Sequence, residues 1–217
     1  MTRVSAFIDG FNLYHAILAT GQNHLKWANL RQLCEVFAPR PQFDLGDVFF
    51  FTAYAPWRQA SYARHREFVQ ALASVGVTTV LGEFKKKDRE CFACGSRWTD
   101  HEEKETDVNI AIHLLNEARR GSFERALIVS GDSDLAPAVR MLRSEFPGKQ
   151  VRVITPVGRR SSKELGIAAG DLSFCRLMKV THLERSLFGA TVLGSDSSVV
   201  ASRPPAYDPP LAPPATP

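Results

Sequence analysis

Aspartates follow directly after two apolar runs of this sequence. Asp9 follows the first run, Asp132 and Asp134 follow the second, and Asp107 begins a helical pattern between them. In an open parallel sheet the carboxyl ends of the strands face one crevice where ligands bind, so we expect these carboxylates to converge there. Grouped carboxylates are the ligands that hard divalent cations prefer. The pattern therefore predicts a metal-dependent enzyme that acts on a phosphate-bearing substrate.

Mg²⁺ or Mn²⁺ would use one or two of these carboxylates per ion, together with phosphate oxygens of the substrate. A bound ion would activate a water for attack on phosphorus and neutralise charge on the phosphate. Asn12 and Lys104 lie close to the aspartates in the sequence and are candidate catalytic residues. Each aspartate alone could instead be a helix N-cap. A cap does not explain a carboxylate at the end of a buried strand, because an unpaired buried charge is costly.

A predicted helix carries Asp107 in its apolar stripe. The other residues of this stripe are Ile110, Ala111, Leu114, Leu115 and Ala118, which follow at helical spacings. Asp107 is therefore expected to point inward.

The elements that must position these residues alternate between strands and helices. Apolar runs predict strands at about 4–8, 47–54, 77–83, 126–130 and 150–155. Helical periodicity covers about 11–20, 29–37, 58–75, 104–120, 134–145 and 162–169. Strands without polar alternation suit burial on both faces. We therefore expect an α/β fold, a three-layer α/β/α sandwich around a parallel sheet of about five strands.

The chain length and composition predict one domain. With 217 residues, 44% of them hydrophobic, a single core is expected over residues 1–183, with a polar insertion at about 86–103. Residues 184–217 form a tail rich in Pro, Ser and Ala that is predicted to be disordered. Without a membrane-spanning apolar run or a secretion signal, we expect a soluble, cytoplasmic protein that does not bind membranes.

Basic clusters and a helix start are candidates for binding phosphates. The net charge is +4, and Lys85–Lys87 would either contact a polyanion or form ordinary solvated surface. Ser161 and Glu164 have the spacing of a capping box, which by itself predicts a helix start. A helix N-terminus flanked by arginines would also bind a phosphate. The candidate substrate-binding residues are Arg159, Arg160, Ser161, Ser162 and Ser130.

Cys91 and Cys94 form a C-x-x-C-G turn in the polar insertion. This turn suits half of a zinc site, with His101 as a candidate third ligand. A homodimer could also pool two cysteine pairs around one Zn²⁺. The alternatives are a redox pair or two inert thiols.

Four stretches, in order, resemble the NYN domains, specifically the LabA-like branch, of the PIN-like nuclease superfamily. They are Phe7 to Tyr14, Glu103 to Val108, Val129 to Asp134 and Val153 to Asp171. The resemblance implies strand order 3-2-1-4-5 and an Mg²⁺- or Mn²⁺-dependent ribonuclease, and we expect it to cut single-stranded RNA internally. By position, Asp9, Asp107 and Asp132 match the family's metal-binding residues, Asp134 a frequent fourth, Asn12 the asparagine of the first motif, and Asp171 a late aspartate.

Competing α/β chemistries lack their motifs, because the sequence contains no G-x-G-x-x-G, no Walker lysine loop and no G-x-S-x-G elbow. The remaining alternative is a non-catalytic module on the same fold that binds RNA or another protein. A degenerate module of this kind should have lost acidic positions, and this sequence retains them.

Overall fold

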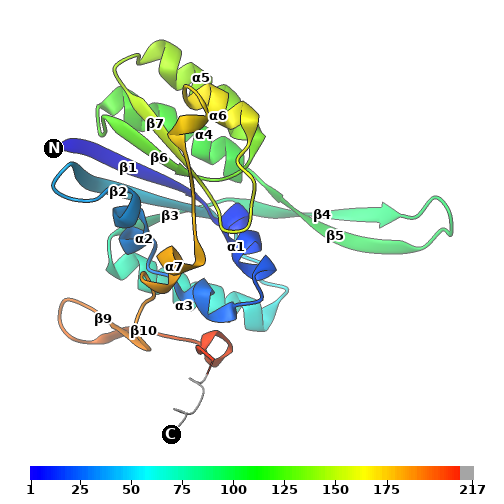
Figure 1. Ribbon diagram of the computed structural model, residues 1–217. Coiled ribbons are helices and arrows are strands. Elements are labelled where there is room, and N and C mark those ends of the chain that lie inside the picture. Colours follow the sequence, from blue (N-terminus) through cyan, green and yellow to red (C-terminus); the bar gives the residue numbers. More distant parts are fainter. Residues whose placement is uncertain (211–217) are drawn as a thin grey trace, which may run out of the picture.

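A six-stranded parallel sheet forms the centre of the protein (Figure 1). The structure, a computed structural model, describes residues 1–210. The strands are β1 (Thr2–Asp9), β2 (Phe43–Thr52), β3 (Val77–Leu81), β6 (Arg125–Val129), β7 (Gln150–Thr155) and β8 (Cys175–Leu177). Their order is β3-β2-β1-β6-β7-β8, which is the expected order with β8 added at one edge. The strand order therefore reverses between β1 and β6.

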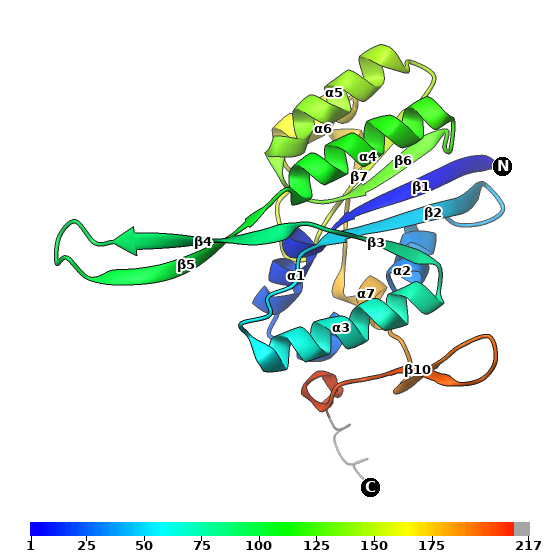
Figure 2. The ribbon, with the colours of Figure 1, turned by 180° about the vertical axis from the view of Figure 1, so that it is seen from behind.

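Helices cover both faces of this sheet, as Figures 1 and 2 show. The helices are α1 (Gly10–Ala19), α2 (Leu30–Phe37), α3 (Gln59–Ser74), α4 (Thr106–Arg120), α5 (Ala136–Glu145) and α6 (Lys163–Ala169). Apolar residues of α1, α2 and α3 pack with Ile8 of β1 in one core. Residues of α4, α5 and α6 pack with Phe7 in a second core on the opposite face. The predicted three-layer sandwich is confirmed.

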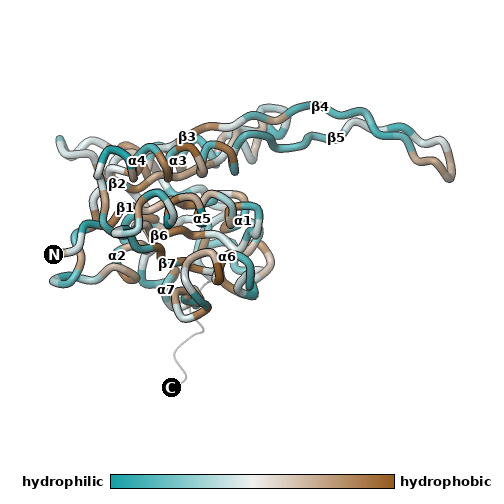
Figure 3. The backbone as a smooth tube through the Cα atoms, turned by 90° about the horizontal axis from the view of Figure 1, so that it is seen from above, coloured by the Kyte–Doolittle hydropathy of each residue, from teal (hydrophilic) through white to brown (hydrophobic). Residues whose placement is uncertain are grey.

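The predicted polar insertion is a long antiparallel hairpin that projects from the domain (Figures 1 and 2). Its strands are β4 (Glu83–Glu90) and β5 (Arg97–Lys104). Figure 3 shows that both strands are hydrophilic along most of their length. Residues 83–104 contain six basic and six acidic side chains. Lys85 pairs with Glu83 at 3.0 Å and Lys87 with Glu102 at 3.3 Å, so much of the basic charge of this hairpin is compensated within it.

The C-terminal segment is ordered well beyond residue 183, so the prediction of disorder from 184 is wrong for residues up to 210. This segment contains α7 (Val180–Glu184), β9 (Thr191–Leu193), β10 (Val199–Ser202) and the short helix η4 (Pro205–Tyr207). Val192 and Ala201 are buried in the core on the α1 side of the sheet. These strands are too short for periodicity to reveal them. The last residues of the predicted tail, 211–217, lie outside the described residues. Across residues 1–210, none of the helices combines the length and apolarity needed to cross a membrane.

Candidate metal centre

Asp9 lies at the point where the strand order reverses. Ile8 of β1 is in register with Val129 of β6, so Asp9 and Ser130 leave the sheet side by side. The buried Asp9 carboxylate accepts a hydrogen bond from the Asn12 backbone N–H at 2.9 Å and one from the Ser130 hydroxyl at 2.8 Å. Both carboxylate oxygens are thus oriented by neighbouring residues.

Hydrogen bonds also connect the turn after β1 to the turn after β6. The Gly131 N–H donates to Asn12 Oδ1 at 3.0 Å, and the Asp132 N–H donates to Ser130 Oγ at 3.0 Å. Asp132 Oδ1 accepts from the Asp134 N–H at 2.9 Å, which starts the short helix η2 (Ser133–Leu135). The two acidic turns are therefore held in a defined relation to each other.

Asp107 reaches the same place from the start of α4. It is half-buried, and burial raises its pKa to about 6, with further contributions from the charges of Asp9, Asp132, Glu103 and Asp134. Burial also raises the pKa of Asp9, although the hydrogen bonds from Asn12 and Ser130 oppose this. These mutual effects define one acidic cluster, which consists of Asp9, Asp107, Asp132, Asp134 and Glu103.

The acidic cluster carries negative charge that no neighbouring cation balances. Among residues 1–210, no lysine, arginine or histidine forms an ion pair with a member of the acidic cluster. The same residues contain no group of three His, Cys, Asp or Glu side chains that surrounds a single ion position. Mg²⁺ does not need such a cage, because one or two carboxylates, several waters and substrate phosphates complete its shell. The uncompensated carboxylates fit an ion of this kind.

Glu103 is the member of the acidic cluster that sequence reasoning did not assign to the site. It lies at the base of β5, and its carboxylate accepts a hydrogen bond from the backbone N–H of Thr106 at 3.1 Å. This bond holds the start of α4, where the preceding residue Glu105 has a left-handed backbone with φ 76°. The position of Glu103 four residues before Asp107 was the only sequence feature that could have indicated a role in the site. The path of the hairpin then brings Glu103 toward Asp9.

Three of the predicted site residues have constraints that the sequence did not show. The expectation that Ser130 contacts substrate is wrong, because its side chain is fully buried and binds Asp9. Asn12 already uses its side-chain oxygen on Gly131, which leaves its amide nitrogen for a ligand. Lys104 is exposed and pairs with Glu102 at 3.0 Å.

The loop before α6 borders the acidic cluster. Arg159 and Arg160 are exposed, and the Arg160 carbonyl lies close to Gly131 in the turn after β6. Ser162 is the N-cap of α6, since its side chain accepts from the Leu165 N–H at 3.2 Å. The predicted capping box of Ser161 is therefore wrong, because the Ser161 hydroxyl instead bonds Thr155 Oγ1 at 2.9 Å.

Two other predicted residues take part in local structure. Asp171 caps the short helix η3 (Leu172–Phe174). His101 is opposite Lys86 in the hairpin. Lys86 lies five residues before Cys91, a distance of about 16 Å along the strand, so His101 is far from the turn that holds Cys91 and Cys94. The structure thus does not assemble Cys91, Cys94 and His101 around one zinc ion.

A parallel sheet of this order, covered by helices on both faces, is a three-layer α/β/α sandwich, consistent with a PIN-like fold. A model of the NYN domain matches residues 3–176, and the chain belongs to the NYN domain family. It is 24% identical over 82% of its length to 6-hydroxy-3-succinoylpyridine 3-monooxygenase HspA of Pseudomonas putida, of which the match covers 71%. A crystal structure of a protein of unknown function from Vibrio parahaemolyticus is similar, with a TM-score of 0.56 and 20% identity. That match covers 82% of this chain and 93% of the other, and it shows the fold.

Proposed function

We propose that this protein is a ribonuclease that uses Mg²⁺ or Mn²⁺ to hydrolyse phosphodiester bonds within single-stranded RNA. The observation that supports this most is the uncompensated acidic cluster at the reversal of strand order in an NYN domain. NYN domains have a PIN-like nuclease fold, and we place this chain in the LabA-like branch on its four sequence stretches.

Within this proposal, Asp9, Asp107 and Asp132 would hold the ion, and Asp134 would contribute from the exposed side. A bound ion would supply an activated water and would neutralise charge on the phosphate. Ser130 positions the Asp9 carboxylate through its hydroxyl group, and Asn12 joins the two acidic turns. Residues of the chain thus orient the Asp9 and Asp132 carboxylates before substrate arrives, which lowers the cost of organising the site.

The test is cleavage of a mixed panel of single-stranded RNAs. We expect cutting in Mg²⁺ or Mn²⁺ and none in excess chelator. Asp132→Asn should cleave at least about 100-fold more slowly, because one carboxylate of the acidic cluster is removed. If Asp132→Asn cleaves as fast as the parent, the activity comes from a contaminant. If the parent cuts none of the RNAs, the result would favour a non-catalytic module that binds RNA or another protein.

Arg159 and Arg160 should contribute sequence-independent contacts to the RNA backbone. We expect the double replacement Arg159→Gln with Arg160→Gln to weaken RNA binding for all sequences. The slope of log K against log salt should fall by about one unit for each phosphate that is no longer neutralised. Binding would be measured in chelator, so that cleavage does not interfere.

The matched control for this experiment is the replacement of Lys85 and Lys87 by glutamine. Because both lysines are paired with carboxylates in the hairpin, we expect a smaller change of slope there. If the slope of log K against log salt is unchanged in the arginine variant, Arg159 and Arg160 do not contact RNA phosphates and are ordinary solvated surface residues.

For Cys91 and Cys94 we propose a zinc site shared by two chains. A structural zinc site needs four ligands, and the turn supplies two. Burial is slight at Cys94, and hydrogen bonding with Ser96 and Cys91 lowers its pKa, which favours the thiolate form that binds metal. Protein purified without chelator should contain about one zinc per two chains, and Cys91→Ser should lose it. Cys175→Ser is the control, and zinc well below this ratio in the parent would exclude the shared site.

A further inference from the structure

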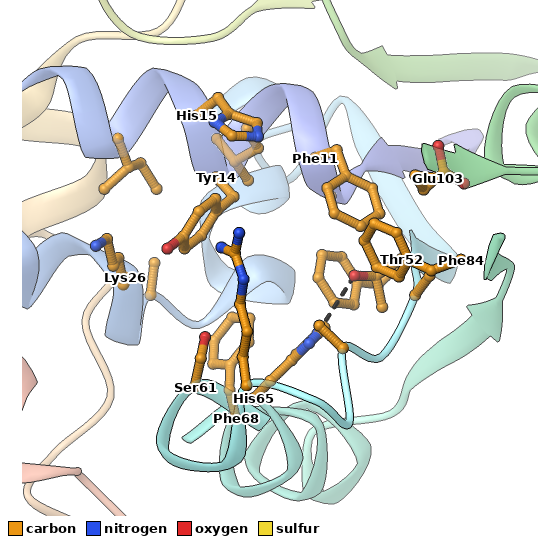
Figure 4. Close-up of a pocket in the computed structure, with 18 of the residues that line it drawn as sticks. Phe11, Tyr14, His15, Lys26, Thr52, Ser61, His65, Phe68, Phe84 and Glu103 are labelled. Atoms are coloured by element: carbon orange, nitrogen blue, oxygen red, sulfur yellow. Dashed lines mark hydrogen bonds between the residues drawn. The ribbon is translucent and has the colours of Figure 1, made fainter. Parts of the chain in front are cut away.

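A cavity of about 420 Å³ adjoins the acidic cluster (Figure 4). It lies between α1, the short helix η1 (Asn23–Trp27), α3 and the base of the β4–β5 hairpin. Gly10 and Phe11, which line it, follow directly after Asp9, and Glu103 belongs to both the cavity wall and the acidic cluster. A ligand in this cavity would therefore reach the place where we propose that phosphate is cleaved.

Aromatic side chains form much of the cavity wall. The ring of His101 stacks on Trp57 with centroids 3.8 Å apart and an angle of 15° between the ring planes. Phe84 meets Trp57 edge-on at 5.0 Å and Phe11 edge-on at 5.5 Å. Trp57 is 40% exposed, so part of its ring is accessible to a ligand. Such faces are surfaces on which a planar heterocycle stacks.

Polar groups lie among these aromatic rings. Burial lowers the pKa of His65 to about 4, so its ring is neutral at pH 7 and offers one donor and one acceptor. Its Nε2 lies 3.3 Å from the Thr52 hydroxyl. Among the described residues, the buried Nε2 of His101 has no hydrogen-bond partner. The neutral donor and acceptor of His65 suit the edge of a base better than they suit a charged group.

A positive charge lies at the end of the cavity away from Glu103, as Figure 4 shows for Lys26. Lys26 Nζ is 5.0 Å from the centre of the Tyr14 ring and forms no salt bridge within residues 1–210. Lys26 Nζ and Arg64 Cζ each lie 5.9 Å from the centre of the Tyr207 ring, so two cations border one ring, and burial and the charge of Arg64 lower the pKa of Lys26. The cavity thus joins an unbalanced positive end to aromatic walls and an acidic mouth.

We propose that this cavity receives one unstacked nucleotide of the RNA strand, with its base against Trp57 and a flanking phosphate at Lys26. The inference rests on the proposed function, because it places the next phosphate at the acidic cluster. The cavity volume lies in the range of sites for small molecules. A base enters such a pocket only after it has left its stack, so the cavity explains a preference for single strands over duplexes.

Binding is tested without catalysis, by equilibrium dialysis in chelator. The probes are the four nucleoside 5′-monophosphates, ribose 5-phosphate as the matched compound without a base, and nicotinic acid as a small aromatic acid. We expect at least one nucleotide to bind more tightly than both other probes. Trp57→Ala should weaken that binding about tenfold through the loss of stacking, while Trp98→Ala on the hairpin should leave it unchanged. Equal binding of ribose 5-phosphate, a preference for nicotinic acid, or unchanged binding by Trp57→Ala would overturn the proposal.

Cleavage is tested separately on single strands that differ at one base beside the cut. Trp57→Ala should lose base preference at that position, and Lys26→Gln should raise KM more than it lowers kcat. If the parent cuts RNA and the Trp57→Ala variant shows the same base preference, the cavity assignment alone would be overturned. A parent that binds nucleotides but cuts no RNA would overturn the proposed function and leave the nucleotide site supported. Melting temperatures of both variants within a few degrees of the parent would exclude loss of folding as the cause.

Discussion

Asp107→Asn should abolish most RNA cleavage and yet produce a more stable protein when metal is absent. The pKa of Asp107 is raised to about 6 by burial and by four neighbouring carboxylates, so its ionised form destabilises the native state at neutral pH. Within residues 1–210 its side chain accepts no hydrogen bond, so asparagine removes charge without breaking a hydrogen bond. A gain of about 1 kcal/mol would raise the melting temperature by about 2–4 °C. Cleavage in Mg²⁺ should fall at least about 100-fold.

Added Mg²⁺ should reverse this difference. An ion that binds the folded parent stabilises it by mass action, and the variant with one carboxylate fewer should gain less. Melting in chelator and in Mg²⁺ measures both effects. Asp47→Asn, at an exposed position of β2, is the matched control and should change neither. An Asp107→Asn protein that is less stable than the parent in chelator would show that the acidic cluster is not held under charge repulsion.

Gly10→Ala should destabilise the fold strongly at the residue that links Asp9 to α1. A Cβ at position 10 would lie 2.4 Å from the Phe51 carbonyl oxygen and 2.7 Å from the Phe50 ring. Because the carbonyl belongs to the central strand β2, it cannot move aside without disturbing the sheet. The cost should be near the upper end of overpacking effects, about 3 kcal/mol. For a protein of this size that corresponds to a loss of about 6–12 °C in melting temperature.

Gly148→Ala is the matched control for this substitution. A Cβ at position 148 meets no atom within 4 Å, and its backbone is not in the left-handed region. We expect a change of less than about 1 kcal/mol, toward greater stability, since alanine reduces the freedom of the unfolded chain. Equal melting temperatures for Gly10→Ala and the parent would mean that the start of α1 lies farther from β2 than in the structure.

The sequence by itself determined the elements and the acidic residues. The strands and helices predicted from periodicity correspond to β1, β2, β3, β6 and β7 and to α1 through α6, usually within a few residues. Unbroken apolar runs such as Val48 to Phe51 indicated burial on both faces, and the structure has a core on each face. These features follow from spacing along the chain, and spacing is what a sequence records directly.

Only the tertiary structure decided how residues from distant segments meet. Glu103 joins the acidic cluster because the hairpin returns to its own base beside α4, and His101 stacks on Trp57 rather than near the cysteines. Ser130 positions Asp9 instead of contacting substrate because β1 and β6, far apart in the sequence, are neighbours in the sheet. The short strands β9 and β10 are ordered by burial of Val192 and Ala201, without a periodic signal of their own. The chain records local spacing, whereas these contacts depend on how the sheet and the hairpin bring separate segments together.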